Sequence, residues 1–164
     1  MVKTKFWFLQ NYLWIFIFFL VCMIALGIFS GLNNRLDISI GFLTLFVSSF
    51  FFVQKQRIEE LRLFQEIFKE FNQRYDNLNN ALNEICDKDE GSPISDKERQ
   101  TLYDYFNLCG EEYFYHKQRH IYPEVWDSWI NGMKYFYVKP RIQKVWDEEL
   151  KQNSYYGFEK SLLK

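Results

Sequence analysis

Residues 48–71 read SSFFFVQKQRIEELRLFQEIFKEF, and within a few positions this stretch changes from apolar to charged. The run 50–53 is as apolar as the interior of a bilayer, whereas Lys55, Arg57 and Glu59 are typical of a helix surface in water. No proline, glycine or cluster of turn residues interrupts the stretch. It therefore predicts one continuous helix that leaves a membrane and enters an aqueous compartment.

Composition separates the chain into two parts at about residue 53. Hydrophobic residues make up 48% of the chain, and nearly all of residues 6–53 is apolar. Of the 20 basic and 21 acidic residues, three basic and one acidic precede residue 54, which leaves 17 basic and 20 acidic residues beyond it. A domain that binds nucleic acid through its phosphates is normally basic, so we expect no direct nucleic-acid binding here.

The first apolar segment covers about residues 6–29. Gln10 and Asn11 are its only strongly polar residues, and 24 helical residues rise about 36 Å, enough to cross a hydrocarbon core of about 30 Å. Trp7 and Trp14 lie near one end, where interfacial aromatic residues are enriched. The segment predicts a transmembrane helix.

The second apolar segment, 38–53, rises about 24 Å, which is several ångströms short of a full span. Gly41, Thr44 and Ser48 share one face of this helix. Small and hydroxylated faces are where helices pack in lipid, so this stripe either packs against the first helix or a neighbouring copy, or lines a water-filled lumen. The candidate pore-lining or packing residues are Gln10, Asn11, Ser39, Gly41, Thr44, Ser48 and Ser49.

The short connection between the two segments predicts a helical hairpin over residues 1–53. Lys3 and Lys5 precede the first segment, and Lys55 and Arg57 follow the second, whereas the connection carries only Arg35, offset by an aspartate. The excess of positive charge on cytoplasmic loops then places both termini in the cytoplasm.

The aqueous part, residues 54–164, opens with a strict heptad pattern that predicts a long helix over about 54–86. Aromatic residues occupy half of its apolar heptad positions. This composition favours a wide interface with other helices over a dimeric coiled coil. The candidate residues for an oligomer seam are Leu61, Phe64, Phe68, Phe71 and Tyr75.

Three further helices are expected, because start signals recur along the chain. Ser95 with Glu98 forms a capping-box pattern, and Pro123 and Pro140 each stand at a favoured first helical position. No alternating strand pattern occurs. The fold class is therefore all-α: a transmembrane helical hairpin that continues into a cytoplasmic helical bundle.

Residues that could carry chemistry are few. His116 and His120 lack the additional ligands that a metal site needs, and Cys22, Cys86 and Cys109 have no metal-ligand spacing, so we expect no metal and no cofactor. The glutamate pair at 111–112 is interpreted as a solvated helix face. Trp126, Trp129 and Trp146 are interpreted as core residues.

The stretch RYDNLNN, residues 74–80, is a weak match to a catalytic motif. Helical ribonucleases of the higher-eukaryote-and-prokaryote nucleotide-binding (HEPN) class place a histidine four to six residues after an arginine. Asn79 or Asn80 stands in that place after Arg74, and asparagine cannot act as the general acid or base of strand cleavage. A domain of this type would be a degenerate, HEPN-like version, and we predict that the chain is not an enzyme.

In its layout, with an N-terminal apolar anchor, a small helical domain and the vestigial motif at Arg74, Asn79 and Asn80, the whole chain resembles the membrane accessory proteins of type VI-B CRISPR systems. The resemblance implies a homo-oligomeric pore, a cyclic ring in the bacterial inner membrane, that acts with an RNA-guided nuclease to depolarise the infected cell. Two alternatives are a membrane-anchored adaptor that docks a cytoplasmic partner, and a membrane-bound ribonuclease.

Overall fold

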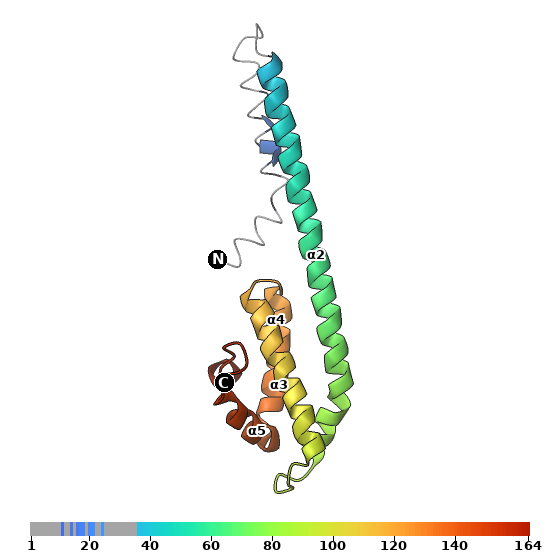
Figure 1. Cartoon of the computed structure of the whole chain (residues 1–164), viewed down its shortest axis with the longest axis vertical. Helices are drawn as coiled ribbons and strands as arrows, with labels where there is room; N and C mark the ends of the chain where they lie inside the picture. Colours follow the sequence, from blue (N-terminus) through green and yellow to red (C-terminus); the bar gives the residue numbers. More distant parts are fainter. Residues whose placement is uncertain (1–10, 12–13, 15, 19, 22–23, 25–35) are drawn as a thin grey trace. The chain divides into compact units, whose positions relative to one another are not determined.

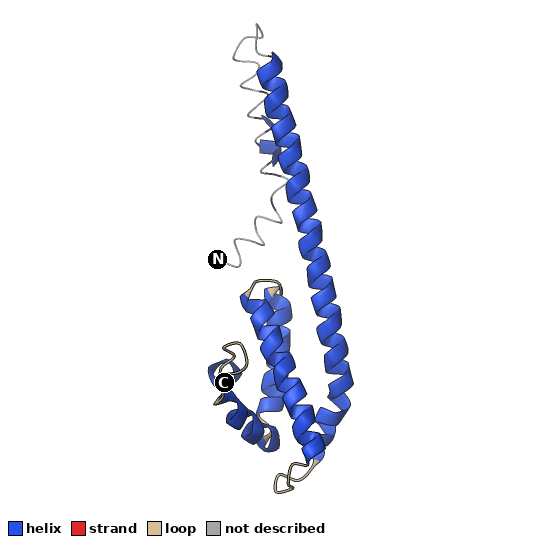
Figure 2. Ribbon diagram, viewed as in Figure 1, coloured by secondary structure: helices blue, strands red, loops and turns tan. Residues whose placement is uncertain are grey.

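The computed structural model describes residues 11, 14, 16–18, 20–21, 24 and 36–164, and every regular element in these residues is helical, with no strand (Figure 2). The all-α fold class is thereby confirmed. The chain divides into two compact units, Met1–Arg62 and Leu63–Lys164, each described here by itself. The described helices are α2 (Leu36–Asp87), α3 (Asp96–Lys117), α4 (Pro123–Tyr137), α5 (Pro140–Leu150) and the short 3-10 helix η1 (Lys160–Leu163).

Helix α2 runs without interruption through 52 residues (Figure 1). It includes both the apolar segment 38–53 and the predicted long helix 54–86, and it ends one residue beyond the predicted boundary. The compact C-terminal unit begins at Leu63, whereas the sequence places the boundary at residue 54. Ile58 and Leu61, which lie between these two boundaries, are exposed, so this part of α2 contributes no core to the C-terminal unit.

The N-terminal unit contains the end of α2 that carries the apolar segment. Phe16 lies edge-on to Phe46 and to Phe50, with ring centroids 5.2 Å apart in each pair. Most of the predicted first segment, 6–29, lies outside the described residues. Within the described part of the chain, no helix has the combination of length and apolarity that crossing a membrane requires.

The starts of the later helices follow the local signals in the sequence. The Ser95 hydroxyl accepts a hydrogen bond from the Glu98 backbone N–H, and the Glu98 carboxylate accepts one from the Ser95 backbone N–H at 2.8 Å, so the predicted capping box is confirmed. Pro123 opens α4 and Pro140 opens α5, also as predicted.

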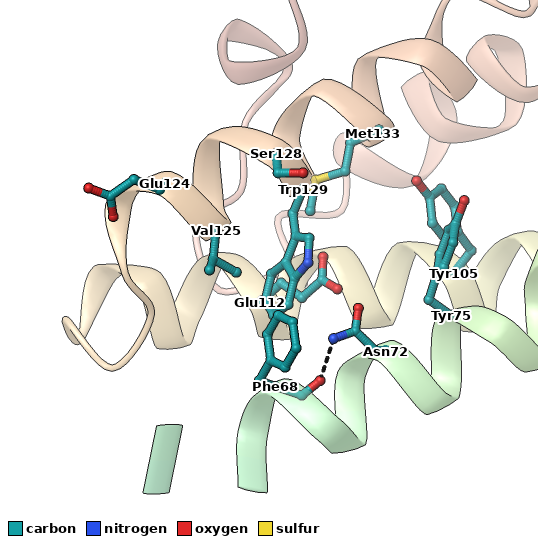
Figure 3. A pocket seen from close by; sticks show the side chains of 11 residues that line it. Phe68, Asn72, Tyr75, Tyr105, Glu112, Glu124, Val125, Ser128, Trp129 and Met133 are labelled. Carbon is teal, nitrogen blue, oxygen red and sulfur yellow. Dashed lines mark hydrogen bonds between the residues drawn. The ribbon is translucent and has the colours of Figure 1, made fainter. Parts of the chain in front are cut away.

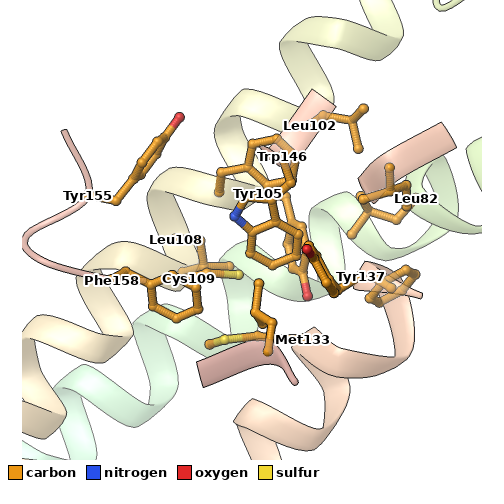
Figure 4. Packing of buried hydrophobic residues seen from close by; sticks show 14 of the residues in the cluster. Leu82, Leu102, Tyr105, Leu108, Cys109, Met133, Tyr137, Trp146, Tyr155 and Phe158 are labelled. Atoms are coloured by element: carbon orange, nitrogen blue, oxygen red, sulfur yellow. The ribbon is translucent and has the colours of Figure 1, made fainter. Parts of the chain in front are cut away.

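The core of the C-terminal unit is built around Trp146 of α5, which is 1% exposed (Figure 4). Its ring stacks on Phe106 at 4.5 Å between centroids, and it meets Tyr105 and Tyr137 edge-on at 5.6 and 5.8 Å. Both geometries are favourable for aromatic pairs. The core interpretation of Trp146 is confirmed, and Trp126 is also buried.

The chain end after α5 completes this core, although it has little regular structure. Tyr155, Phe158 and Leu163 are buried, and Phe158 stacks on Trp146. The approach of Tyr155 to α3 is so close that a Cβ at Gly110 would lie 3.2 Å from the Tyr155 Cβ. Gly110 is therefore the residue that lets this segment lie against α3.

Arg141 ties the start of α5 to the turn between α2 and α3. Its buried guanidinium donates to the carbonyl of Ile85 at 2.6 Å and to the Glu98 carboxylate at 3.2 Å. The first of these bonds satisfies a carbonyl in the last turn of α2, which has no partner within the helix. The same capping contacts at Ser95, with Lys88 and Arg141, hold the pKa of Glu98 down at about 2.

Candidate functional site

The polar stripe predicted on α2 is left exposed within the N-terminal unit. Thr44 and Ser48 are exposed, and a Cβ built at Gly41 would meet no atom within 4 Å. The described contact with the first segment is instead made by Phe46 and Phe50, through Phe16. Thr44 and Ser48 thus keep side-chain surface that is exposed in the single chain.

The other predicted stripe residues are placed as follows. The Ser49 hydroxyl donates to the Leu45 carbonyl at 2.8 Å, a local bond within α2. Ser39 belongs to α2, and Asn11 is helical and half-buried. Gln10 lies outside the described residues.

Large apolar side chains around the stripe are also exposed. Phe52, for example, is 69% exposed and Leu45 is 66% exposed. Exposed large apolar side chains that form a patch are typical of surfaces that contact protein or lipid. Among the described residues of this unit, the exposed large apolar ones are Trp14, Ile17, Phe18, Val21, Ile24, Leu43, Leu45, Val47, Phe51, Phe52, Ile58 and Leu61.

The predicted oligomer-seam residues on α2 differ in their environments. Phe71 is 2% exposed and packs edge-on against Tyr115 and Trp129 of its own unit. Phe64 lies edge-on to Tyr122 at 4.5 Å and is partly buried, and so is Tyr75. Phe68 and Leu61 are 40% and 38% exposed, and they are the two most exposed of the predicted seam residues.

The stretch 74–80, which the sequence predicts to be a degenerate HEPN-like motif, takes part in an ion pair between two helices. The Arg74 guanidinium donates to both oxygens of Glu111 on α3, at 2.5 and 3.2 Å, and this hydrogen bonding raises the pKa of Arg74. Asn79 accepts a hydrogen bond from the Tyr75 hydroxyl at 3.2 Å, and Asn80 is exposed. The described ion-pair partners of Arg74 are thus Glu111 on α3 and Glu70 on its own helix.

The main cavity of the C-terminal unit has a volume of about 510 Å³ and lies among α2, α3 and α4 (Figure 3). Phe68 and Trp129 stack at its side with ring centroids 6.0 Å apart. None of the lining residues is basic, whereas two are glutamates. The lining residues are Phe68, Asn72, Tyr75, Tyr105, Glu112, Glu124, Val125, Ser128, Trp129, Gly132 and Met133.

Glu112 is the unusual member of this lining, because it is a carboxylic acid with only 7% of its surface exposed. Within the part of the chain that the structure describes, its carboxyl group makes no hydrogen bond and no ion pair. Burial raises the pKa of Glu112 to about 8, with a further rise from Glu111 that Arg74 opposes. At neutral pH this side chain is therefore mostly uncharged.

The interpretation of residues 111–112 as a solvated face is wrong for Glu112. The two neighbours point to different environments, since Glu111 bonds Arg74 at the domain surface while Glu112 enters the cavity. One sequence signal was available. Tyr105, Cys109 and Glu112 follow each other at helical spacing on the buried face of α3. Glu112 therefore stands at a position where this spacing predicts a core residue.

The two histidines have separate surroundings. His116 stacks on Trp126 at 4.4 Å, and its partial burial lowers its pKa, whereas His120 lies 6.2 Å from the ring of Tyr115. Among the described residues, no group of three or more histidine, cysteine, aspartate or glutamate side chains is placed to hold a metal ion.

Comparison with known proteins gives no match to a family model, to a curated protein or to a solved structure.

Proposed function

We propose that the chain is a membrane-embedded homo-oligomer that permeabilises the bacterial inner membrane. In this proposal the apolar hairpin 1–53 enters the bilayer from the cytoplasmic side, and several copies close into a ring around a lumen. The helical unit stays in the cytoplasm with both termini. The role in antiviral defence with an RNA-guided nuclease rests on the resemblance in layout alone.

The observation that carries the proposal is the exposed stripe of Gly41, Thr44 and Ser48 beside exposed large apolar residues. In lipid the hydrophobic effect does not drive helices to associate. Association depends instead on close packing at small residues and on contacts between polar groups. A ring of copies would cover part of the stripe at each interface and turn the rest to the lumen, while Leu43, on the other side of the helix, would face lipid.

A dye-efflux measurement with the full chain in liposomes tests this function. We expect Ser48→Phe to reduce efflux, because the added ring projects from the stripe. Leu43→Phe is the matched control, since Leu43 is exposed and lies about 200° around the helix from Gly41. Equal effects of the two variants, with equal membrane insertion, would contradict a lumen lined by this stripe.

A second function, membrane-anchored docking of a cytoplasmic partner, is favoured by the cavity with the buried Glu112. Here the hairpin only anchors, so an unrelated apolar hairpin of equal length in place of residues 6–53 keeps activity. Loss of protection from phage in that chimaera, with the cytoplasmic unit intact, supports the pore instead.

A further inference from the structure

The geometry points to a binding site for an organic ammonium cation with an apolar stem in the cavity among α2, α3 and α4. Glu112 supplies the counter-charge, and Phe68 and Trp129 supply an aromatic wall. The inference is independent of the pore. It rests on and deepens the second proposed function, membrane-anchored docking, because it names the chemistry that a docked partner would present to this cavity.

The first argument is the unpaired carboxyl group. Glu112 exposes only 7% of its surface, and no described hydrogen bond or ion pair holds its carboxyl group, whose oxygens are not fully enclosed but open to the cavity. A buried polar group without a partner is costly and calls for an explanation. Glu112 lines the cavity together with Trp129 (Figure 3), so a ligand in this space can supply the missing partner.

The second argument is the chemistry of the remaining lining. The Asn72 amide nitrogen donates to the Phe68 carbonyl at 2.7 Å, and the amide oxygen points into the cavity as a second acceptor (Figure 3). Glu124 adds a carboxylate at the exposed side. Acceptors and negative charge without any basic group select a cation that donates hydrogen bonds.

The third argument is the aromatic wall. The faces of aromatic rings carry negative potential and attract ammonium groups, most strongly at tryptophan. The parallel rings of Phe68 and Trp129, 12° apart in plane, also offer apolar surface to a carbon stem. A cavity of about 510 Å³ is large enough for an organic molecule and has too few oxygen donors for a bare metal ion.

Binding is coupled to proton release. The neutral carboxyl group loses its proton to water as the ammonium group arrives, and a carboxylate–ammonium pair forms, so charge and atoms balance. Since the pKa of Glu112 in the empty cavity is about 8, roughly 0.9 proton leaves per ligand at pH 7. Other titratable or charged groups that face Glu112 or the cavity are Arg74 and Tyr75 on α2, Tyr105, Cys109 and Glu111 on α3, and Glu124 on α4.

The affinity for an ammonium ion therefore rises as pH passes through the pKa of Glu112 and levels off above it. The carboxylate fraction grows about tenfold between pH 7 and pH 9, so the dissociation constant falls about tenfold over the same range. A neutral ligand gives no such change.

Isothermal titration calorimetry of the full chain in dodecylmaltoside, with phenethylammonium as the probe, tests the proposal. Pairs of buffers with different ionisation enthalpies report the protons released. We expect the tenfold tightening and about 0.9 proton for the natural chain, and loss of both effects in Glu112→Gln. Glu84→Gln makes the same change at an exposed carboxylate outside the cavity and keeps both.

Two more probes make the result decisive. 2-Phenylethanol has the same stem without the charge, and N-acetyl-lysine methylamide presents the same ammonium group on a peptide-like stem. Tighter binding of either ammonium probe supports the proposal and indicates whether a free amine or a lysine side chain is the source. Equal binding of 2-phenylethanol and phenethylammonium, or unchanged proton release in Glu112→Gln, would overturn it.

A second variant guards against misfolding of Glu112→Gln. Trp129→Leu removes the aromatic face but keeps the carboxyl group, so we expect at least severalfold weaker binding with proton release still present. Binding that is unaffected by Trp129→Leu would contradict the aromatic wall.

Discussion

The substitution Glu112→Gln is expected to make the protein more resistant to alkaline conditions. Glutamine keeps the size of the neutral glutamic acid but cannot ionise. In the natural chain, unfolding exposes Glu112 to water, where its pKa returns to about 4.5 from about 8 in the folded state. A carboxyl group with a raised folded-state pKa stabilises the fold fully below the unfolded pKa, and this contribution is lost as pH rises through the folded pKa.

The magnitude follows from the two pKa values. At pH 5 Glu112 is protonated in the folded state and about three-quarters ionised in the unfolded state, so only about 1 kcal/mol of its contribution has been lost by that pH. At pH 9 the folded state must hold a buried carboxylate, and linkage gives a loss of about 4 kcal/mol in unfolding free energy between pH 5 and pH 9. The variant lacks this loss, so its stability relative to the natural chain should rise by about that amount.

Urea unfolding of the full chain in dodecylmaltoside, followed by tryptophan fluorescence at several pH values, measures this difference. The lowered pKa of His116 gives an opposing trend near its own titration range, but it is common to both proteins and cancels in the difference. Glu84→Gln, at an exposed carboxylate, should show no rise. The opposite result is a difference in unfolding free energy between Glu112→Gln and the natural chain that stays constant within about 1 kcal/mol from pH 5 to pH 9. That result would refute the claim that Glu112 is a buried acid with a raised pKa.

Three other substitutions probe the aromatic core and the ion pairs of Arg141 and Arg74. Trp146→Ala removes the centre of the aromatic core and should cost about 3–5 kcal/mol of unfolding free energy in urea titrations. Arg141→Ala strips the donor from Ile85 and Glu98, and should cost about 3 kcal/mol in the same assay, since one partner of a buried pair remains. Arg74→Ala breaks a partly exposed ion pair with Glu111, so a loss of about 1 kcal/mol is expected, and any RNA cleavage by the preparation should be unchanged. A loss of several kcal/mol for Arg74→Ala, or RNA cleavage that disappears with it, would contradict this assignment.

Helix starts were predictable because their causes are local. The capping box at Ser95 and Glu98 needs only residues three apart, and Pro123 and Pro140 act through their own backbone geometry. The all-α class followed from the same short-range patterns.

Burial along α2 could not be read from the heptad pattern, because the pattern is the same where a domain packs on the helix and where none does. Phe71 and Leu82 are buried in the C-terminal unit, whereas Leu61 and Phe68 keep exposed surface. Which heptad positions of α2 are buried depends on where α3 and α4 begin and end. Residues far away in the sequence determine those limits.

The cavity was missed for the same reason. Glu112 was assigned to solvent because carboxylates normally remain there, and its burial follows from the way α3 packs with α2 and α4. The closing segment was missed because Tyr155 and Phe158 reach the core from irregular chain, which has no periodicity to detect.

The central proposal, a ring of copies in the membrane, is tested most directly by the mass of the detergent-solubilised protein from light scattering corrected for bound detergent. One chain has a mass of 20.1 kDa, so an assembly of six or more copies has a protein mass of about 120 kDa or more. We predict a single discrete species of at least that size. A protein mass of one or two chains would contradict the ring and leave the docking function as the account of this protein.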